Sequence, residues 1–270
     1  MSFANWKPLI WSKYIQTELP KFTVFEKDCD YKYQGEVEKG KTVKISGAAR
    51  PTIGNYTGAS IGSPETPADT SVYLLIDQAK YFNIAVDDVD KAQAIPGIME
   101  TYINEGIRAQ AETRDTYLAT LMAQNYGTLS SSTSVSSKST AKAAIDLALV
   151  TLWDAGVSPK DDVTMYLSPK VYQYMNEYIT EAKTNNDALM ASGVLGMYSG
   201  AKIKMTNNLY NDGTDDYIPV KTSKAVAFCT GISKTEAYRP DDLFEDAVKS
   251  LDTYGGKVVR PKELYIIRAH

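Results

Sequence analysis

The chain has 270 residues, with 29 Lys and Arg, 33 Asp and Glu and one His, which give a formal net charge of -4 at pH 7. A composition of 43% hydrophobic and 23% charged residues is typical of a globular protein and excludes a disordered one. The excess of acidic over basic residues disfavours a nucleic-acid-binding function, because proteins that bind nucleic-acid phosphates normally carry more basic than acidic residues.

The single histidine and the two cysteines limit the possible catalytic and metal sites. The only imidazole belongs to His270, at the end of the sequence, where we expect it to be held too loosely for a Ser-His-Asp or Cys-His nucleophile or for zinc. Cys29 and Cys229 form no C-x-x-C pair. One disulfide is possible by count, but two thiols in so long a chain are typical of buried small side chains in a reducing compartment.

The sequence shows neither a targeting signal nor a membrane segment. Its start lacks the charged and apolar regions of a secretory signal, and no stretch reaches 18 apolar residues. The sequence therefore predicts a protein made and used in a cytoplasm, without a membrane partner.

The first 30 residues are unusually apolar for a chain terminus. Trp6, Trp11, Tyr14 and Phe22 are among their large side chains. A free terminus would leave this surface in water, so we expect residues 1–30 to lie on the chain's own core or on a neighbouring chain.

Residues 31–76 are predicted to form β structure interrupted by a long loop. The segment 42–46 alternates polar and apolar residues, and 72–76 is a second apolar strand. The connection between them is rich in Gly and Pro and longer than the connections usual in a compact domain. We therefore predict a protruding β-arm, with a disordered surface loop as the alternative.

The clearest helix of the chain is predicted over 98–126, after a strand over 81–86. Apolar residues recur in it every three or four positions, a proline precedes its start and a glycine follows its end. A helix of this length extends about 43 Å and would form a spine. Glu105 and Arg108 can pair along its outer face.

The Ser-rich segment 128–140 is predicted to be a linker or exposed loop that separates two subdomains. The elements expected after it are a helix ending at Gly156, a strand over 163–167, a helix from Ser168-Pro169 and a strand over 201–205. Two further apolar strands are predicted over 225–230 and 264–267. Gly255 and Gly256 are predicted to mark a break between elements in the interval that separates them. No internal repeat is visible.

One segment matches the consensus sequence of the phosphate-binding P-loop. The residues from Gly35 to Thr42 fit G-x-x-x-x-G-K-[ST], which binds phosphate only between a strand and a helix. Here 42–46 alternates as a strand, and Glu36 and Glu38 would repel phosphate. A hairpin turn is therefore the favoured interpretation.

Two further patterns also lack their structural setting. The run from Gly58 to Gly62 fits G-x-S-x-G, but it has no strand, helix or histidine to complete a nucleophile elbow. The acidic groups at 87–90 and 211–216 lack the order of a calcium loop and are expected to face water. We therefore predict an α+β protein with no catalytic residues, no cofactor and no metal site.

Positive charge gathers on the predicted arm. Lys41, Lys44 and Arg50 suit either plain solubility or contact with an acidic neighbouring chain. Because neither the arm nor the apolar start can bury itself, the sequence predicts assembly with other copies.

The segment 75–93 carries a resemblance to a known family. It is similar to the ID-x-x-x-YF-x-F-x-VDD-x-D-x-x-Q pattern that leads into the spine helix of major capsid proteins of tailed bacteriophages, with Ile84 in place of the second Phe. The segments 33–37 and 42–45 resemble the start of their extended loop, and 254–267 resembles their closing strand. The order of the predicted elements resembles the Hong-Kong-97 capsid fold along most of the chain.

This resemblance implies an α+β Hong-Kong-97-type fold in four parts. The parts would be an N-terminal arm over 1–30, an extended loop over 31–76, a peripheral domain over 77–139 and 226–270 with its spine helix at 98–126, and an axial domain over 140–225.

The resemblance also implies a structural protein without a cofactor. Such subunits form hexamers and pentamers of an icosahedral shell around double-stranded DNA, assembled in the host cytoplasm with a scaffolding protein and a portal, and located in the virion capsid. The candidate inter-subunit contact residues are Trp6, Trp11, Tyr14, Phe22, Lys44, Arg50, Tyr56, Glu105 and Arg108. The alternatives are an encapsulin-like nanocompartment shell and a P-loop nucleotide hydrolase.

Overall fold

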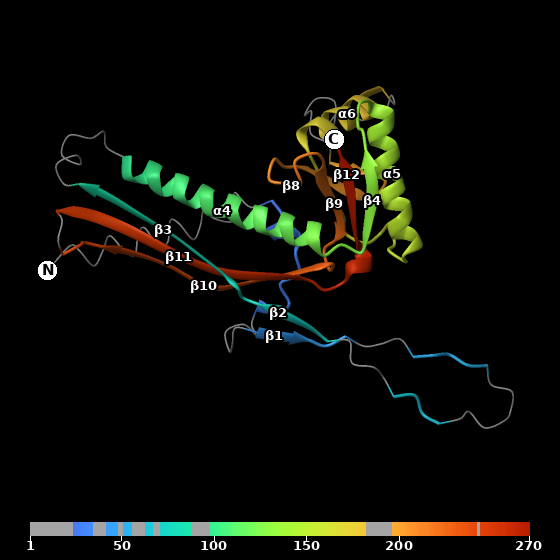
Figure 1. The fold of residues 1–270 in the computed structure, drawn as a ribbon, viewed down its shortest axis with the longest axis horizontal. Coiled ribbons are helices and arrows are strands. Elements are labelled where there is room, and N and C mark those ends of the chain that lie inside the picture. Colours follow the sequence, from blue (N-terminus) through green and yellow to red (C-terminus); the bar gives the residue numbers. More distant parts are fainter. Residues whose placement is uncertain are drawn as a thin grey trace.

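The computed structural model describes residues 24–34, 42–47, 51–55, 63–66, 71–87, 98–181, 196–241 and 244–270. In these residues a long helix lies along a three-stranded sheet, and a seven-stranded sheet with two helices joins one end of this layer (Figure 1). A two-stranded sheet packs below the three-stranded one and leads to a projecting arm (Figure 1). The α+β prediction is confirmed.

The three-stranded sheet and its helix form the elongated part of the molecule. The sheet is antiparallel, in the order β10 (Val226–Tyr238), β11 (Glu245–Val258) and β3 (Gln78–Asp87). The helix α4 (Ile98–Gln124) has 27 residues and so extends about 40 Å. Phe82 of β3 packs against its buried residues Ile103, Ile107 and Ala111. The predicted spine helix and the strand over 81–86 are confirmed.

Gly255 and Gly256 lie inside β11, so the prediction that they mark a break between two elements is wrong. They are needed because both faces of the sheet are closely covered there. A Cβ atom on Gly255 would lie 2.0 Å from the Leu75 carbonyl oxygen of β2 (Val72–Leu75), whereas one on Gly256 would lie 3.0 Å from Leu121 of α4. Each glycine thus permits the approach of a different neighbour.

The seven-stranded sheet is mixed and forms the second layer. Its order is β4 (Thr128–Thr133), β12 (Leu264–Ala269), β9 (Asp216–Thr222), β5 (Val163–Leu167), β7 (Ala201–Met205) and β6 (Met197–Tyr198), with β8 (Tyr210–Asn211) also paired to β9. The helices α5 (Lys138–Asp154) and α6 (Pro169–Glu181) pack on one face over a core that includes Ile145, Leu149 and Met165. The predicted strands at 163–167, 201–205, 225–230 and 264–267 and both helices are confirmed.

The prediction of a linker over 128–140 is wrong. Its first part is β4, an edge strand that pairs in parallel with β12, and its last residues begin α5. Ser and Thr are accepted in β4 because most of its side chains are exposed or half-buried. The Ser137 side chain accepts the Thr140 backbone N–H, and the Thr140 hydroxyl accepts the Ser137 N–H, which makes a capping box.

The base of the arm is a two-stranded antiparallel sheet. It consists of β1 (Thr42–Ile45) and β2, so the strands predicted over 42–46 and 72–76 are confirmed. Val43, Ile45 and Leu74 face the three-stranded sheet and pack with Ala227 and Cys229. This core lies on the sheet face opposite α4.

Beyond β1 and β2, the described segments 51–55 and 63–66 project away from the body of the molecule (Figure 1). The Glu65 carboxylate accepts hydrogen bonds from the Thr52 backbone N–H at 2.9 Å and from its hydroxyl at 3.2 Å. The two limbs of the arm are thus tied together, as the predicted β-arm requires.

Candidate contact surfaces

A buried arginine fastens the described start of the chain to the spine helix. Arg114 of α4 donates to the Asp252 carboxylate of β11 at 2.7 and 2.6 Å and to Glu26 at 3.0 Å. Glu26 begins the short 3-10 helix η2 (Glu26–Asp28). Arg114 and Asp252 are almost fully buried. This network fixes the point at which the N-terminal segment joins the body.

Asp115, the next residue of α4, binds the same segment through its backbone. Its carboxylate accepts the Val24 N–H at 3.2 Å and the Phe25 N–H at 3.4 Å. Burial raises the pKa of Asp115 to about 6, because desolvation of the carboxylate outweighs these backbone hydrogen bonds.

Asp28 ties the segment to the seven-stranded sheet. Its carboxylate accepts the Tyr166 hydroxyl at 2.5 Å and the Lys204 ammonium at 2.6 Å. The Lys221 ammonium, whose residue is fully buried, donates to the Asp28 carbonyl oxygen. The N-terminal segment therefore enters the molecule at the junction of both sheets, among Phe25, Phe228 and Tyr254 of the shared core.

The structure describes three of the nine predicted contact residues. Lys44 lies on the exposed face of β1, whereas Glu105 and Arg108 lie on the exposed face of α4. Arg108 pairs with Glu105 at 3.9 Å, as predicted, and also with Glu112 at 3.7 Å. The other six lie outside the described residues: Trp6, Trp11, Tyr14, Phe22, Arg50 and Tyr56. The three-stranded sheet separates Lys44 from the other two, so these residues do not form one site.

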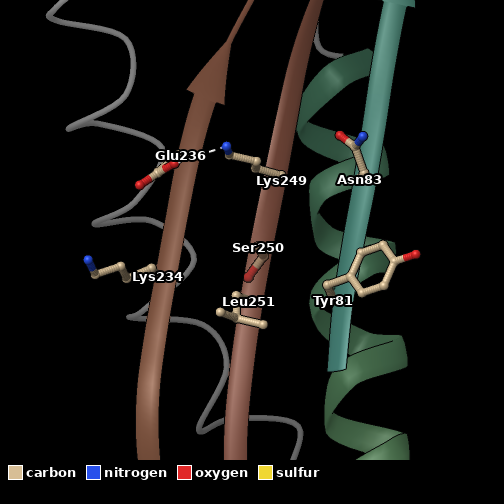
Figure 2. Close-up of a pocket in the computed structure, with 7 residues that line it drawn as sticks. All are labelled: Tyr81, Asn83, Lys234, Glu236, Lys249, Ser250 and Leu251. Carbon is tan, nitrogen blue, oxygen red and sulfur yellow. Dashed lines mark ion pairs between the residues drawn. The ribbon is translucent and has the colours of Figure 1, made fainter. Parts of the chain in front are cut away.

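Sequence reasoning missed an open face on the three-stranded sheet. Beyond the part covered by β1 and β2, Tyr81, Leu251 and Lys234 form one row across the strands, and Asn83, Lys249 and Glu236 form the next (Figure 2). Lys249 pairs with Glu236 at 3.2 Å. Only the period-2 alternation of β3 could have indicated this face, since Tyr81 is 79% exposed and Phe82 is not.

Other large apolar side chains are exposed on several elements, of which the arm, β2 and α5 are examples. Ile53 lies on the projecting arm, Tyr73 and Leu75 lie on the outer face of β2, and Leu147 and Val150 lie along α5. Exposed apolar surface of this extent is typical of proteins that contact other chains.

The prediction that His270 is loosely held is wrong. Its backbone N–H donates to Thr133 of β4, and its Nδ1 atom lies 3.0 Å from Asp215 Oδ1 and 3.2 Å from the Ser132 hydroxyl. This set resembles a Ser-His-Asp triad in composition only. A triad uses both ring nitrogens, whereas here the serine and the aspartate share one, so the imidazole cannot pass a proton between them.

The remaining sequence-motif matches also lack the structural setting that phosphate binding or catalysis would require. Thr42 begins a strand and not a helix, which contradicts the P-loop interpretation, and the rest of that motif lies outside the described residues, as does the run from Gly58 to Gly62. Asp212 accepts the backbone N–H groups of Asp215 and Thr214, which lowers its pKa, in a turn where Gly213 has φ of +96°. The prediction that the acidic group at 211–216 faces water is wrong for Asp215, which is buried against Ser132 and His270.

Asp87 ends β3, while the acidic residues after it lie outside the part of the chain described. Both cysteines are buried free thiols. Among the residues with described positions, no three His, Cys, Asp or Glu side chains gather as metal ligands. Within the same residues, none of the helices combines the length and the apolar character needed to cross a bilayer.

The comparisons with known proteins point to one class of particle. No family model and no curated protein matches the sequence. A solved structure from Mycobacterium phage Che8 is 30% identical, covers 91% of this chain and 90% of its own, and has a TM-score of 0.79. The capsid of cyanophage P-SCSP1u is 17% identical over 92% and 88%, with a TM-score of 0.76. A virus-like particle from Pyrococcus furiosus is 10% identical over 97% and 99%, with a TM-score of 0.62.

Proposed function

The chain belongs to the major capsid proteins of tailed bacteriophages, with the Hong-Kong-97 fold, and from this membership we propose that it assembles into hexamers and pentamers of an icosahedral shell that encloses double-stranded DNA. The observation that carries this proposal is the projecting arm. Its described limbs extend into solvent, and Ile53 on them is 84% exposed (Figure 1). A second copy of the chain can bury a surface held so far from its own body.

The mechanism is multivalent burial. Each copy offers the arm, the open sheet face and the apolar positions of α5, and each of these contacts is modest by itself. Once some contacts of a ring or shell are made, the remaining ones become effectively intramolecular. A closed shell is therefore stable even where a pair of subunits is not.

We propose two domains within this fold. The peripheral domain contains β3, α4, β10 and β11, and the axial domain contains the elements of residues 140–225. Pairing in the seven-stranded sheet supports assigning β4 and β12 to the axial domain as well, although the sequence-based boundaries had assigned their residues to the peripheral one.

The proposed role is structural, without enzymatic activity. Assembly would take place in the host cytoplasm with a scaffolding protein and a portal, and the mature protein would reside in the virion capsid. The net charge of -4 suits a container wall, because a strongly basic wall would bind DNA phosphates and hinder packaging.

A shell with another content is the second candidate. The similarity to the virus-like particle from Pyrococcus furiosus, which extends over 97% of this chain, favours an encapsulin-like compartment. The two candidates differ in cargo, since one encloses DNA and the other a protein.

Negative-stain electron microscopy of the purified protein tests the proposal. Closed shells or rings of subunits are expected, and nuclease-protected DNA in particles from infected cells would assign the cargo. A monodisperse monomer at high concentration would refute assembly. The variant Ile53→Asp, which places a charge on the arm, should assemble less, whereas Thr214→Asp, which places the same charge on an exposed turn outside these surfaces, serves as the matched control.

A further inference from the structure

Residues 24–34 bond both to the elongated part of the molecule and to the seven-stranded sheet (blue in Figure 1). Besides their bonds to α4, they are fastened to β10 of the elongated part at two points. Asp30 exchanges two backbone hydrogen bonds with this strand, at 2.8 and 3.2 Å. The Gln34 side-chain amide donates to the Thr230 carbonyl oxygen at 2.6 Å and accepts the Thr230 N–H at 2.9 Å. The segment is therefore anchored to the elongated part near both of its ends.

The bonds to the seven-stranded sheet converge on one residue of this segment, Asp28. Its carboxylate accepts the hydroxyl of Tyr166 in β5 and the ammonium of Lys204 in β7, at 2.5 and 2.6 Å. Its carbonyl oxygen accepts the ammonium of Lys221 in β9. Three adjacent strands of one sheet therefore share a single partner on the segment.

The two lysines restrict where Asp28 can lie. Lys221 is fully buried, and its ammonium lies 5.8 Å from the centroid of the Tyr166 ring. The Lys204 side chain is 31% exposed and that of Asp28 is 12% exposed. A buried ammonium that loses its acceptor is strongly disfavoured. The sheet is therefore held in the position from which all three strands reach Asp28.

Apolar packing between the two parts constrains their orientation less closely. They share a core in which the ring centroids of Phe25 and Tyr166 lie 4.4 Å apart. Hydrophobic contact is non-directional, so it opposes separation of the two parts more than rotation of one against the other. Hydrogen bonds prefer a narrow range of distances and angles. The bonds of Asp28 are therefore suited to fix the orientation that the core leaves adjustable.

We propose that residues 24–34 form a strap that sets the orientation of the seven-stranded sheet on the elongated part, with Asp28 as its positioning residue. This inference rests on the proposed shell function. The orientation of the two parts determines the angle at which neighbouring copies meet, so one orientation in every copy gives shells of one size. The strap thereby links a contact inside the subunit to the uniformity of the particle.

The first test measures the orientation in the isolated subunit, at concentrations too low for assembly. Spin labels on Ala109→Cys of α4 and Gln173→Cys of α6 report a distance between the two parts, because both positions are exposed whereas Cys29 and Cys229 are buried. The labelled subunit should give a single narrow distance distribution, and Asp28→Ala should lose it in favour of a broad one. An equally narrow distribution in Asp28→Ala would overturn the proposal.

Asp30→Ala is the matched control, because it makes the same change two residues further along the segment. The Asp30 carboxylate bonds to Lys32, and the bonds of Asp30 to β10 are made by its backbone. This variant should keep the narrow distribution. Equal broadening in both variants would mean that any damage to the segment loosens the subunit, and it would overturn the assignment to Asp28.

Lys204→Met tests the same contact from the side of the sheet, and it replaces Asp28→Ala if that variant does not fold. Its control is Lys202→Met on the same strand, because Lys202 pairs with Asp162 at 2.7 Å and not with Asp28. The distance distribution should broaden in Lys204→Met and stay narrow in Lys202→Met. Equal distributions in the two variants would refute the strap.

Particle size separates this inference from the proposed function. In electron micrographs, wild-type and Asp30→Ala shells should have one diameter, whereas Asp28→Ala shells should vary in diameter. Asp28→Ala shells as uniform as those of the wild type would overturn the control of shell size by the strap and leave the shell function standing. Failure of the wild type to form any particle would instead overturn the shell function.

Discussion

Asp115 makes the docking of the N-terminal segment depend on pH. Its carboxylate is fully buried between α4 and the backbone of Val24 and Phe25, and burial raises its pKa from an ordinary 3.8 to about 6. Glu26 beside it adds to this shift, whereas the Asn208 side chain opposes it. The folded subunit therefore binds this proton more tightly than the unfolded chain does.

The sign and size of the effect follow from linkage. A raised pKa of an acid means that protonation stabilises the folded state, so the contribution of Asp115 is greatest below pH 4 and is lost as the pH rises through about 6. The difference between the two pKa values corresponds to about 3 kcal/mol. Other carboxylates give slopes of either sign, so the effect has to be read as a difference between two variants.

The assay compares the wild type with Asp115→Asn in urea unfolding, from pH 4 to pH 7, at concentrations too low for assembly. Asn cannot titrate but keeps an oxygen for the backbone N–H groups. Relative to this variant, the wild type should gain about 2 kcal/mol on going from pH 7 to pH 4, most of the full difference. Asp154→Asn, at an exposed carboxylate, should give a difference that does not vary in this window. A constant difference for Asp115→Asn, or a gain toward higher pH, would refute the reasoning.

Three further substitutions test the packing. Asp252→Asn leaves the buried Arg114 charge without its closest partner and should lower the free energy of unfolding by about 3 kcal/mol in chemical denaturation. Gly255→Ala should displace β2 and lower the melting temperature, whereas Gly54→Ala, with no atom within 4 Å, should not; equal effects would contradict the close approach. Ser137→Ala should cost about 1 kcal/mol through loss of the α5 cap, and a thermal melt with no change would argue against the capping box.

The sequence predicted those elements whose pattern is local. The 3.6-residue period of α4 and the alternation in β1 lie in single segments, so both could be located without a structure. The Ser-rich strand β4 could not, because its pairing with β12 depends on residues more than 130 positions away. Composition indicates a loop there, and tertiary pairing overrides it.

The candidate surfaces were predictable only in part. The apolar composition of the first 30 residues and the Gly and Pro content of the arm are visible in the sequence itself, which is why assembly could be expected from it. The open face of the three-stranded sheet could not be expected, since it joins residues of three strands that lie far apart in the sequence.

The polar network at the junction of the two sheets is better explained by positioning than by stability. Buried ion pairs such as that of Arg114 and Asp252 contribute little net stability over apolar residues of the same size, because desolvation offsets their attraction. They do penalise any other placement of their partners. With Glu26 and Asp28 both held, the N-terminal segment has one register on the body. In a shell, where every copy must present its arm in the same geometry, a fixed register matters more than added stability.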